Sequence, residues 1–397
     1  MKAGSPLYTT TTACPVCGRK NKYENLAKGA YTVEGNDTDF MPVGIKWSSD
    51  EMGNTNPLLF FIATCENCYY SVEFTEKFKE WEKDAHFKNY KLKPLRETHK
   101  AKLNEENSPF KVIGKAIEPK QFPNETAICK FLLGIYQEKL SSHPSPLTMG
   151  RFYLRIGWLF RDMKTTGSAG VHARTSILSS LDEKLENMTV ILGNLDKSVK
   201  TLAHFYKDNT SSLFPKARGD DANDIMRGYF NVLNEILGAS DVVKGKIDQI
   251  KALNGNLVNV EMPEAKAQMP KFGEYENFYE FLFSVQKIFA ETPTNEKEAL
   301  SFAAENYKKA METGREIKEG FQAIQAYYLI GELERRIGDD DEARKYFNTV
   351  INQGRSFTAN KSNSSVEMGR VKSIVEKAYE QAKLLSREEM RSESAVS

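Results

Sequence analysis

Two short cysteine motifs constrain the fold of this chain more than any other feature. Cys14-Pro15-Val16-Cys17 and Cys65-Glu66-Asn67-Cys68 hold four of the five cysteines in 397 residues. Two C-x-x-C pairs supply four soft thiolates, the donor set of a tetrahedral structural zinc site. The sequence therefore predicts one structural Zn²⁺ per chain, with four metal ligands: Cys14, Cys17, Cys65 and Cys68. Because four ligands fill a tetrahedral site, we expect it to have no catalytic role.

A thiol-dependent redox enzyme is the alternative interpretation of these motifs. Redox C-x-x-C motifs normally stand at a helix N-terminus near a βαβ pattern, where the thiol pKa is lowered. Neither motif has that context, because polar turns and strand-like runs surround both of them. Structural zinc is therefore the preferred prediction.

The common enzyme signatures are missing from the sequence. It contains no G-x-x-x-x-G-K-[ST], G-x-S-x-G or G-x-G-x-x-G pattern and no H-E-x-x-H pair. Cys129 lies between apolar residues of a predicted helix and is interpreted as a buried side chain. The five histidines stand alone, and most are expected at the surface: His86, His99, His143, His172 and His204. We expect a protein that is not an enzyme, with no catalytic residue and no cofactor site beyond the zinc.

Charge and hydropathy limit the classes of partner. The formal net charge is +1, so the chain as a whole has no electrostatic attraction to nucleic acid or anionic lipid. No run of 18 apolar residues occurs, so no membrane insertion is expected. Nothing at the start of the sequence resembles an export signal, and we expect a cytoplasmic protein.

A nucleic-acid-associated zinc protein is the second alternative. The N-terminal residues include a basic, partly aromatic group: Arg19, Lys20, Lys22, Lys28, Lys46 and Trp47. Acidic residues of the same segment offset these charges: Glu24, Glu34, Asp37, Asp39, Asp50 and Glu51. Binding to phosphates needs a net positive patch, so this balance argues against nucleic acid as a partner.

Hydrophobic patterns predict a mainly α fold with a small β-rich start. Residues 1–75 are expected to form a zinc-ribbon-like module, in which a strand over Leu58–Thr64 leads into the second cysteine motif. The chain is expected to become charged and helical from Glu73 to about Glu105, and residues 76–164 are expected to hold linker helices and the first repeat-like helices. There Gly157 is small enough to let the next helix approach closely.

Residues 165–270 carry the strongest periodic signal of the chain. Apolar residues alternate at spacings of three and four along two segments, which predicts an antiparallel helical hairpin, a coiled coil, joined by a loop with Pro215. The first seam is Leu178, Leu181, Leu185, Met188, Leu192, Leu195, Val199, Leu202 and Tyr206, and the second is Tyr229, Leu233, Ile236, Ser240, Val243, Ile247 and Ile250. The hairpin either pairs only internally or offers an outer stripe with Ile177, Ile191 and Phe205 to another chain, including a second copy.

Residues 271–397 are predicted to form tetratricopeptide-like helical repeats with a capping helix. The spacing of an aromatic, an aliphatic, a small residue, a turn, a small residue and an aromatic fits such a repeat. These positions are Tyr327, Ile330, Gly331, Gly338-Asp339, Ala343 and Phe347. Stacked helical pairs create surfaces that bind protein segments, so we expect a scaffold or adaptor with protein partners.

Several of these stretches together match a known pattern. They are Cys14-Pro15-Val16-Cys17-Gly18, Asp37-Thr38-Asp39-Phe40, Asn56-Pro57-Leu58-Leu59 and the repeat around Gly331. In these stretches the chain resembles the bacterial domain-of-unknown-function family 2225. The resemblance implies a zinc-binding-like N-terminus joined to tetratricopeptide-like helices, and it implies no activity.

Two features depart from that family pattern. Tyr69 follows the second motif where glycine is usual, so the second turn is expected to be made differently or to be looser. The segment of roughly 165–270 is longer than the usual connection, and we expect the features particular to this protein there.

Overall fold

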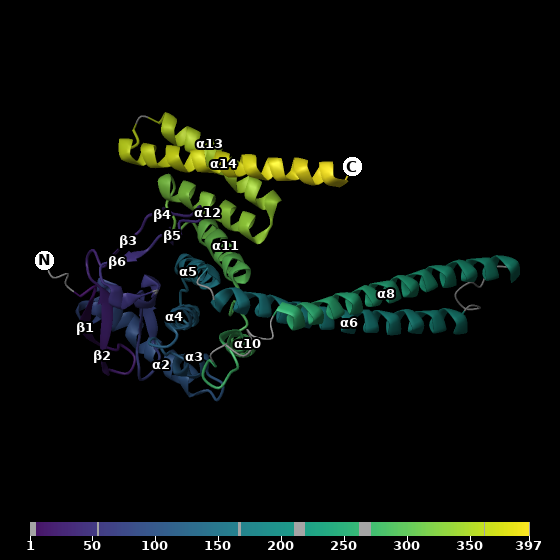
Figure 1. Cartoon of the computed structure of the whole chain (residues 1–397), viewed down its shortest axis with the longest axis horizontal. Helices are drawn as coiled ribbons and strands as arrows, with labels where there is room; N and C mark the ends of the chain where they lie inside the picture. The colour runs from purple at the N-terminus through teal and green to yellow at the C-terminus, as the bar shows by residue number, and fades with distance from the viewer. Residues whose placement is uncertain are drawn as a thin grey trace. The chain divides into compact units, whose positions relative to one another are not determined.

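The computed structural model describes residues 5–53, 55–165, 168–209, 219–261, 271–360 and 362–396. The chain divides into two compact units, one formed by Met1–Thr166 with Pro270–Ser397 and the other by Gly167–Met269 (Figure 1). The predicted fold class is confirmed, since short antiparallel strands open a chain that is otherwise mainly helical. None of the helices within the described residues has both the length and the apolar character needed to cross a membrane.

The N-terminal strands form four separate antiparallel pairs. β1 (Leu7–Ala13) pairs with β2 (Lys20–Leu26), in register from Leu7 opposite Leu26 to Ala13 opposite Lys20. The other pairs are β3 (Tyr31–Thr32) with β6 (Lys46–Trp47), β4 (Gly35–Asn36) with β5 (Pro42–Val43), and β7 (Ile62–Thr64) with β8 (Ser71–Glu73). Each cysteine motif lies in the turn of a hairpin, β1–β2 or β7–β8.

The strand predicted over Leu58–Thr64 is only half correct. Its first part is a 3₁₀ turn over Pro57–Phe60, preceded by the short turn Asp50–Met52, and only β7 is extended. The Asn56 side chain accepts a hydrogen bond from the Leu58 amide at 3.0 Å, and Pro57 cannot donate one. These two residues begin a helical turn where hydrophobicity alone suggests a strand.

The segment from Glu73 to about Glu105 is largely helical, as expected, but the helix is broken into pieces. They are α1 (Glu76–Lys79), a 3₁₀ turn (Trp81–Lys83), a π turn (Phe87–Lys91) and α2 (Leu92–Asn104). Trp81 donates its indole N–H to the Ala13 carbonyl at 2.8 Å, and Asp84 accepts from the Phe87 amide at 2.9 Å. The first contact holds the segment against the first cysteine motif, and the second starts a new helical turn.

The remaining helices of this unit pack in a series, each against the next. α3 (Pro109–Lys115) contacts α2 and α4 (Pro123–Lys139), and α4 contacts α5 (Pro146–Thr165). From α5 the order of packing is α11 (Glu296–Thr313), α12 (Phe321–Ile337), α13 (Asp340–Ala359) and α14 (Ser365–Val396), and α10 (Phe278–Ile288) lies against α3. Each helix buries its apolar stripe against the next one.

Gly157 does let a helix approach closely, but that helix is distant in sequence. A Cβ atom at Gly157 would lie 2.6 Å from the Leu300 side chain of α11. The next helix after α5 along the chain, α6, belongs to the other unit. The packing of α5 against α11 therefore joins two parts of the chain that lie on either side of the inserted segment in sequence.

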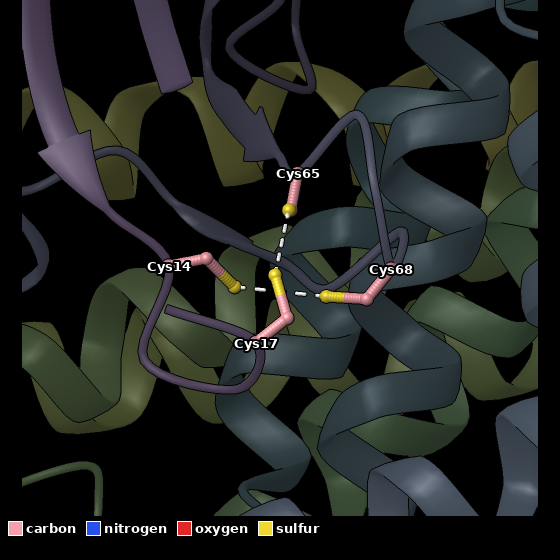
Figure 2. A group of neighbouring side chains, drawn as sticks. All are labelled: Cys14, Cys17, Cys65 and Cys68. Atoms are coloured by element: carbon pink, nitrogen blue, oxygen red, sulfur yellow. Dashed lines mark hydrogen bonds between the residues drawn. The ribbon is translucent and has the colours of Figure 1, made fainter. Parts of the chain in front are cut away.

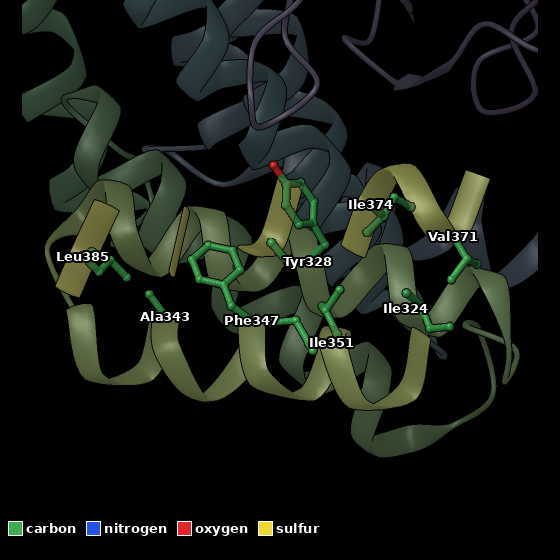
Figure 3. Packing of buried hydrophobic residues seen from close by; sticks show 10 residues of the cluster. Ile324, Tyr328, Ala343, Phe347, Ile351, Val371, Ile374 and Leu385 are labelled. Carbon is green, nitrogen blue, oxygen red and sulfur yellow. The ribbon is translucent and has the colours of Figure 1, made fainter. Parts of the chain in front are cut away.

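The C-terminal core lies between α12, α13 and α14 (Figure 3). Tyr328 and Phe347 are fully buried there with ring centroids 6.0 Å apart. Tyr328, and not the predicted Tyr327, is the fully buried aromatic residue, while Tyr327 packs at the edge of the core. A Cβ atom built at Gly331 would lie 3.0 Å from the Phe347 ring. A residue without a side chain at this position therefore lets α13 pack closely on α12.

The second unit is built on two long helices, α6 (Ser168–Asp208) and α8 (Gly219–Glu261) (Figure 1). They run antiparallel, because Tyr206 near the end of α6 stacks on Tyr229 near the start of α8, while Glu186 binds Lys251 at 2.6 Å. The predicted loop residue Pro215 and the side chains of Ile177 and Leu178 lie outside the described residues.

Only half of each predicted seam is buried in this hairpin. Leu185 and Val199 of α6 and Leu233 and Ile247 of α8 are buried where the two helices pack together, and Leu192 is partly buried. The other half of the seams is exposed: Met188, Leu195, Leu202, Tyr229, Ile236, Val243 and Ile250. One helix covers only part of the circumference of its partner, and these residues lie outside the contact between α6 and α8.

Candidate metal centre

The two cysteine motifs form turns of the same design. In the first, the Gly18 amide donates to the Cys14 carbonyl at 2.9 Å, and the Cys14 amide donates to Arg19 at 2.9 Å. In the second, the Tyr69 amide donates to the Cys65 carbonyl at 2.9 Å, and the Cys65 amide donates to Tyr70 at 2.9 Å. Each turn directs two thiols toward the other motif.

Tyr69 occupies the place that Gly18 has in the first turn. Its φ is +60°, against +77° for Gly18, so a non-glycine residue takes the left-handed conformation there. The expectation of a differently made turn is therefore wrong. Gly114 of α3 explains how the Tyr69 ring fits, since a Cβ atom at Gly114 would lie 2.2 Å from that ring. The absent side chain on α3 makes room for the tyrosine.

The four sulfur atoms gather at one point between the two turns (Figure 2). All four Sγ atoms lie within 4.8 Å of one another, with 3.6 Å between Cys14 and Cys68 and between Cys17 and Cys65. Four thiolates at about 2.3 Å from a tetrahedral zinc ion stand about 3.8 Å apart. The donor set and its spacing thus fit a metal ion, whereas the sulfurs are too far apart for disulfides.

The thiols of this cluster influence each other's ionisation. Contact with the Cys65 sulfur, followed by burial, raises the pKa of Cys14 to about 12. Contacts with Cys14 and Cys65 likewise raise the pKa of Cys68, whereas contacts with Cys14 and Cys68 lower the pKa of Cys65. Packed anionic sulfurs repel one another, and a divalent cation at their centre would favour all four thiolates.

Side chains from outside the two motifs hold them in place. The Asn21 amide group donates to Cys65 Sγ at 3.5 Å, and its Oδ1 accepts from the Glu66 amide at 3.3 Å. Arg96 of α2 donates to the Pro15 carbonyl at 2.7 Å. The cluster is therefore tied both to β2 and to the helical part of the unit, which fixes the direction of the thiols.

His99 is the residue of this site that sequence reasoning missed. Its ring is fully buried, with Nε2 2.8 Å from the Cys68 carbonyl and Nδ1 2.6 Å from Gln137 Oε1. The expectation of a surface position is wrong for His99, although His86, His143 and His204 are exposed and the side chain of His172 is outside the described residues. The spacing of four from Leu95 to His99 and on to Leu103 was the available signal, since it places His99 on the apolar stripe of α2.

A buried ionic cluster forms a second concentration of charge. Asp39 has no exposed surface and accepts from Arg161 at 2.7 and 3.1 Å and from the Trp158 indole at 3.1 Å. Arg161 also binds Asp37 at 2.9 Å and Glu296 at 2.7 Å. The Asp37–Phe40 stretch thus joins the β-rich start to α5 and α11, and Arg336 extends the contact to α12 through Asp37 at 2.9 Å.

A cavity of about 770 Å³ lies beside the second turn and is lined in part by Cys65, Tyr69 and Lys130. Burial lowers the pKa of Lys130 to about 8. Its Nζ donates to the Leu59 carbonyl at 3.0 Å, which joins α4 to the turn before β7. Cys129 next to it is fully buried, as predicted, and burial raises the pKa of its thiol.

Comparison with known proteins adds one finding. No curated protein and no solved structure matches the chain. The family described as "Uncharacterized protein conserved in bacteria (DUF2225)" matches residues 7–202 and 280–372. The match includes both cysteine motifs, the Asp37–Phe40 stretch, most of α6 and the helices α11 to α13, and it leaves out 203–279. The match covers more than half of the chain, and the chain therefore belongs to this bacterial family.

Proposed function

We propose that the protein is a cytoplasmic, non-enzymatic adaptor that binds partner proteins through its helical surfaces, including tetratricopeptide-like pairs. In this proposal the four cysteines hold one structural Zn²⁺. The observation that carries the proposal is a cavity on the α5, α11 and α12 surface that combines apolar walls with a partly buried arginine, with which no carboxylate of the described residues pairs.

The zinc part of the proposal is supported by the donor set. Four thiolates in a tetrahedral spacing suit zinc, and a site with four protein ligands keeps no coordination position for a substrate. Cys14 and Cys65 have no exposed surface, so reagents cannot easily reach them. The two-stranded ribbons around them contain little apolar mass, and metal binding would therefore supply much of their folding free energy.

The cavity has a volume of about 500 Å³, within the range of ligand sites. Leu147, Leu154 and Leu329 contribute to its apolar walls, and Trp158 and Tyr307 add aromatic surface. Gln322 and Gln325 bring amide groups to the same cavity. Such a lining suits a short peptide segment, with apolar side chains against the walls and main-chain groups near the amides.

Arg155 gives this cavity a positive charge. Its guanidinium is largely buried, stacks 4.1 Å above the Phe61 ring and donates to the Arg151 carbonyl at 3.0 Å. Burial, followed by the charge of Arg151, lowers the pKa of Arg155 to about 10. Among the described residues no carboxylate pairs with Arg155, since Glu73 binds Arg151 at 3.0 Å. Glu316, also at the cavity, accepts from the Leu147 amide at 3.1 Å and from the Ser145 hydroxyl.

A carboxylate from outside would relieve the cost of this buried cation. Arginine binds carboxylates through paired N–H donors, and the pair gains strength in a partly dry site. The ligand that fits both the charge and the walls is a peptide segment with a carboxylate next to an apolar side chain. A partner protein can present one as a C-terminal residue or as an acidic residue within an extended segment.

Two matched arrays of random heptapeptides test this proposal with the full-length protein. Both are attached through their N-termini, and one ends in a free carboxylate while the other ends in a carboxamide. We expect selected binders to carry an apolar residue beside a carboxylate, at the C-terminus or within the segment. Binding of the selected peptides should fall at least tenfold for Arg155→Gln.

Two further variants separate a binding role from a folding role. Gln322→Glu adds a negative charge at the exposed edge of the cavity without removing core packing, and we expect it to weaken the same peptides. Arg227→Gln, which removes an arginine on α8 whose side chain is 73% exposed, should leave binding unchanged. An absence of binders, or binders with neither a free carboxylate nor an acidic residue, would refute this function.

A further inference from the structure

The exposed half of the predicted seams forms a continuous apolar stripe on each helix of the hairpin. In α6 the covered positions are Leu185, Leu192, Val199 and Tyr206, and in α8 they are Met226, Leu233, Ser240 and Ile247. Exposed apolar residues follow these positions, or the equivalent position one heptad earlier, by three or six residues in both helices. They are Met188, Ile191, Leu195, Leu202 and Phe205 in α6, and Ile225, Tyr229, Val232, Ile236, Val243, Ile250 and Leu253 in α8.

Helix geometry places both stripes on the same face of the hairpin. At about 100° per residue, steps of three and six turn the side chain by about −60° and −120° from the covered line. The turn has the same sense in both helices, and the helices run antiparallel. Equal rotations on antiparallel neighbours point to one common side, whereas on parallel neighbours they would point to opposite sides. The hairpin therefore has one broad apolar face.

Charge is distributed in the opposite way. The apolar face contains only two charged residues, Lys184 and Lys246, over the ranges Lys184–Phe205 and Ile225–Leu253. The reverse face contains more charged residues, and its exposed large apolar residues are Val190 and Val242. The charged residues are Glu186, Lys197, Lys200, Lys207, Arg227, Asp241 and Asp248. A hairpin that needed only its internal pairing would have no reason to keep charges off one face, and large exposed apolar patches usually mark an interaction site.

The area of this face matches what a stable dimer needs. Its twelve large apolar side chains are 38% to 64% exposed. At about 200 Å² for a complete large side chain, they offer about 1,000 Å² per copy, or about 2,000 Å² when two copies meet. This is at the upper end of the range for standard stable interfaces.

We propose that a second copy of this chain covers the face, so that two hairpins form a four-helix bundle. A flat layer of two helices is best covered by another two-helix layer of equal length, and the chain itself supplies one. The same stripe on both helices makes the face self-complementary about a two-fold axis, as an isologous interface requires. In the bundle each helix buries two adjacent sides, one against its hairpin partner and one against the other copy.

The chain provides a matched pair of valines for the test. Val232 lies on the apolar face and is 55% exposed, while Val190 is 56% exposed on the reverse side of the hairpin, about 140° from Leu185. Sedimentation velocity and light scattering on the full-length protein should give twice the 45.0 kDa chain mass. Val232→Glu should give the single-chain mass, and Val190→Glu should remain dimeric.

A milder pair excludes unfolding as the cause. Threonine has nearly the shape of valine, so Val232→Thr and Val190→Thr keep the helices intact, which circular dichroism checks. We expect the dimer dissociation constant to rise at least tenfold for Val232→Thr, because each dimer contains the change twice, and to stay constant for Val190→Thr. A wild-type chain that sediments as a monomer, or equal effects at positions 190 and 232, would overturn the proposal. Peptide binding at Arg155 is an independent readout, so either proposal can fail alone.

Discussion

Replacing Asp39 with asparagine tests whether the buried ionic cluster holds the β-rich start against the helices. The change keeps the size of the side chain and removes only its charge. Arg161 then loses the carboxylate that it binds at 2.7 Å, while Asp37 and Glu296 remain beside it. Breaking a buried pair costs about 3 to 5 kcal/mol when the remaining charge has no other partner. Because two partners remain, we expect the low end, about 3 kcal/mol.

For a folded unit of this size each kcal/mol corresponds to about 2 °C, so Asp39→Asn should lower the melting temperature by about 6 °C. Intrinsic fluorescence during heating is a direct assay, because all three tryptophans, Trp47, Trp81 and Trp158, lie in this unit and Trp158 donates to Asp39. Glu34→Gln is the matched control, since Glu34 binds Lys46 at 2.6 Å and both side chains are more than half exposed. The control should melt within about 1 °C of the wild type. Equal melting temperatures for the two variants would refute the idea that the cluster stabilises this junction.

Three further predictions concern the same unit. Although burial opposes ionisation of Asp37, the hydrogen bond from the Thr38 amide and the charges of Arg336 and Arg161 lower its pKa. The Asp37 carboxylate therefore contributes its full stability above the ordinary pKa near 4 and loses that contribution as the pH falls through the lower pKa of the folded state. In thermal melts from pH 7 down to pH 2 the stability deficit of Asp37→Asn should shrink over that window, and a constant deficit would contradict this prediction. Gly114→Ala should cost about 2 kcal/mol in urea unfolding because of its clash with the Tyr69 ring, and adding Tyr69→Gly should recover much of that loss, whereas additive losses would show that the ring is not the cause. Metal analysis of the purified protein should find about one zinc per chain, and Cys14→Ser with Cys65→Ser should remove both the zinc and the cooperative unfolding of the β-rich start; intact folding after complete chelation would argue against a structural metal.

The sequence was most informative where residues close together along the chain determine the chemistry or the local structure. Two C-x-x-C motifs bring paired thiols together within a few residues, and the structure then places all four sulfurs within 4.8 Å. Long apolar periodicities likewise predicted the helical body and the helices of the hairpin. Such patterns are local, because a turn or a helical stripe is determined largely by residues that are near each other along the chain.

The tertiary structure decided what surrounds those local patterns. Nothing local indicates that Gly157 will pack against Leu300, that Asp39 will meet Arg161, or that His99 will bind the Cys68 carbonyl. The heptad seam is the clearest case, since spacings of three and four mark a wide apolar stripe but do not say which half a single partner helix will cover. Pairing of α6 with α8 buried Leu185 and left Met188 exposed, because the choice depends on contacts between residues far apart in sequence. The sequence by itself thus determined the candidate metal ligands and the amphipathic helices, and only folding decided which of their faces were used.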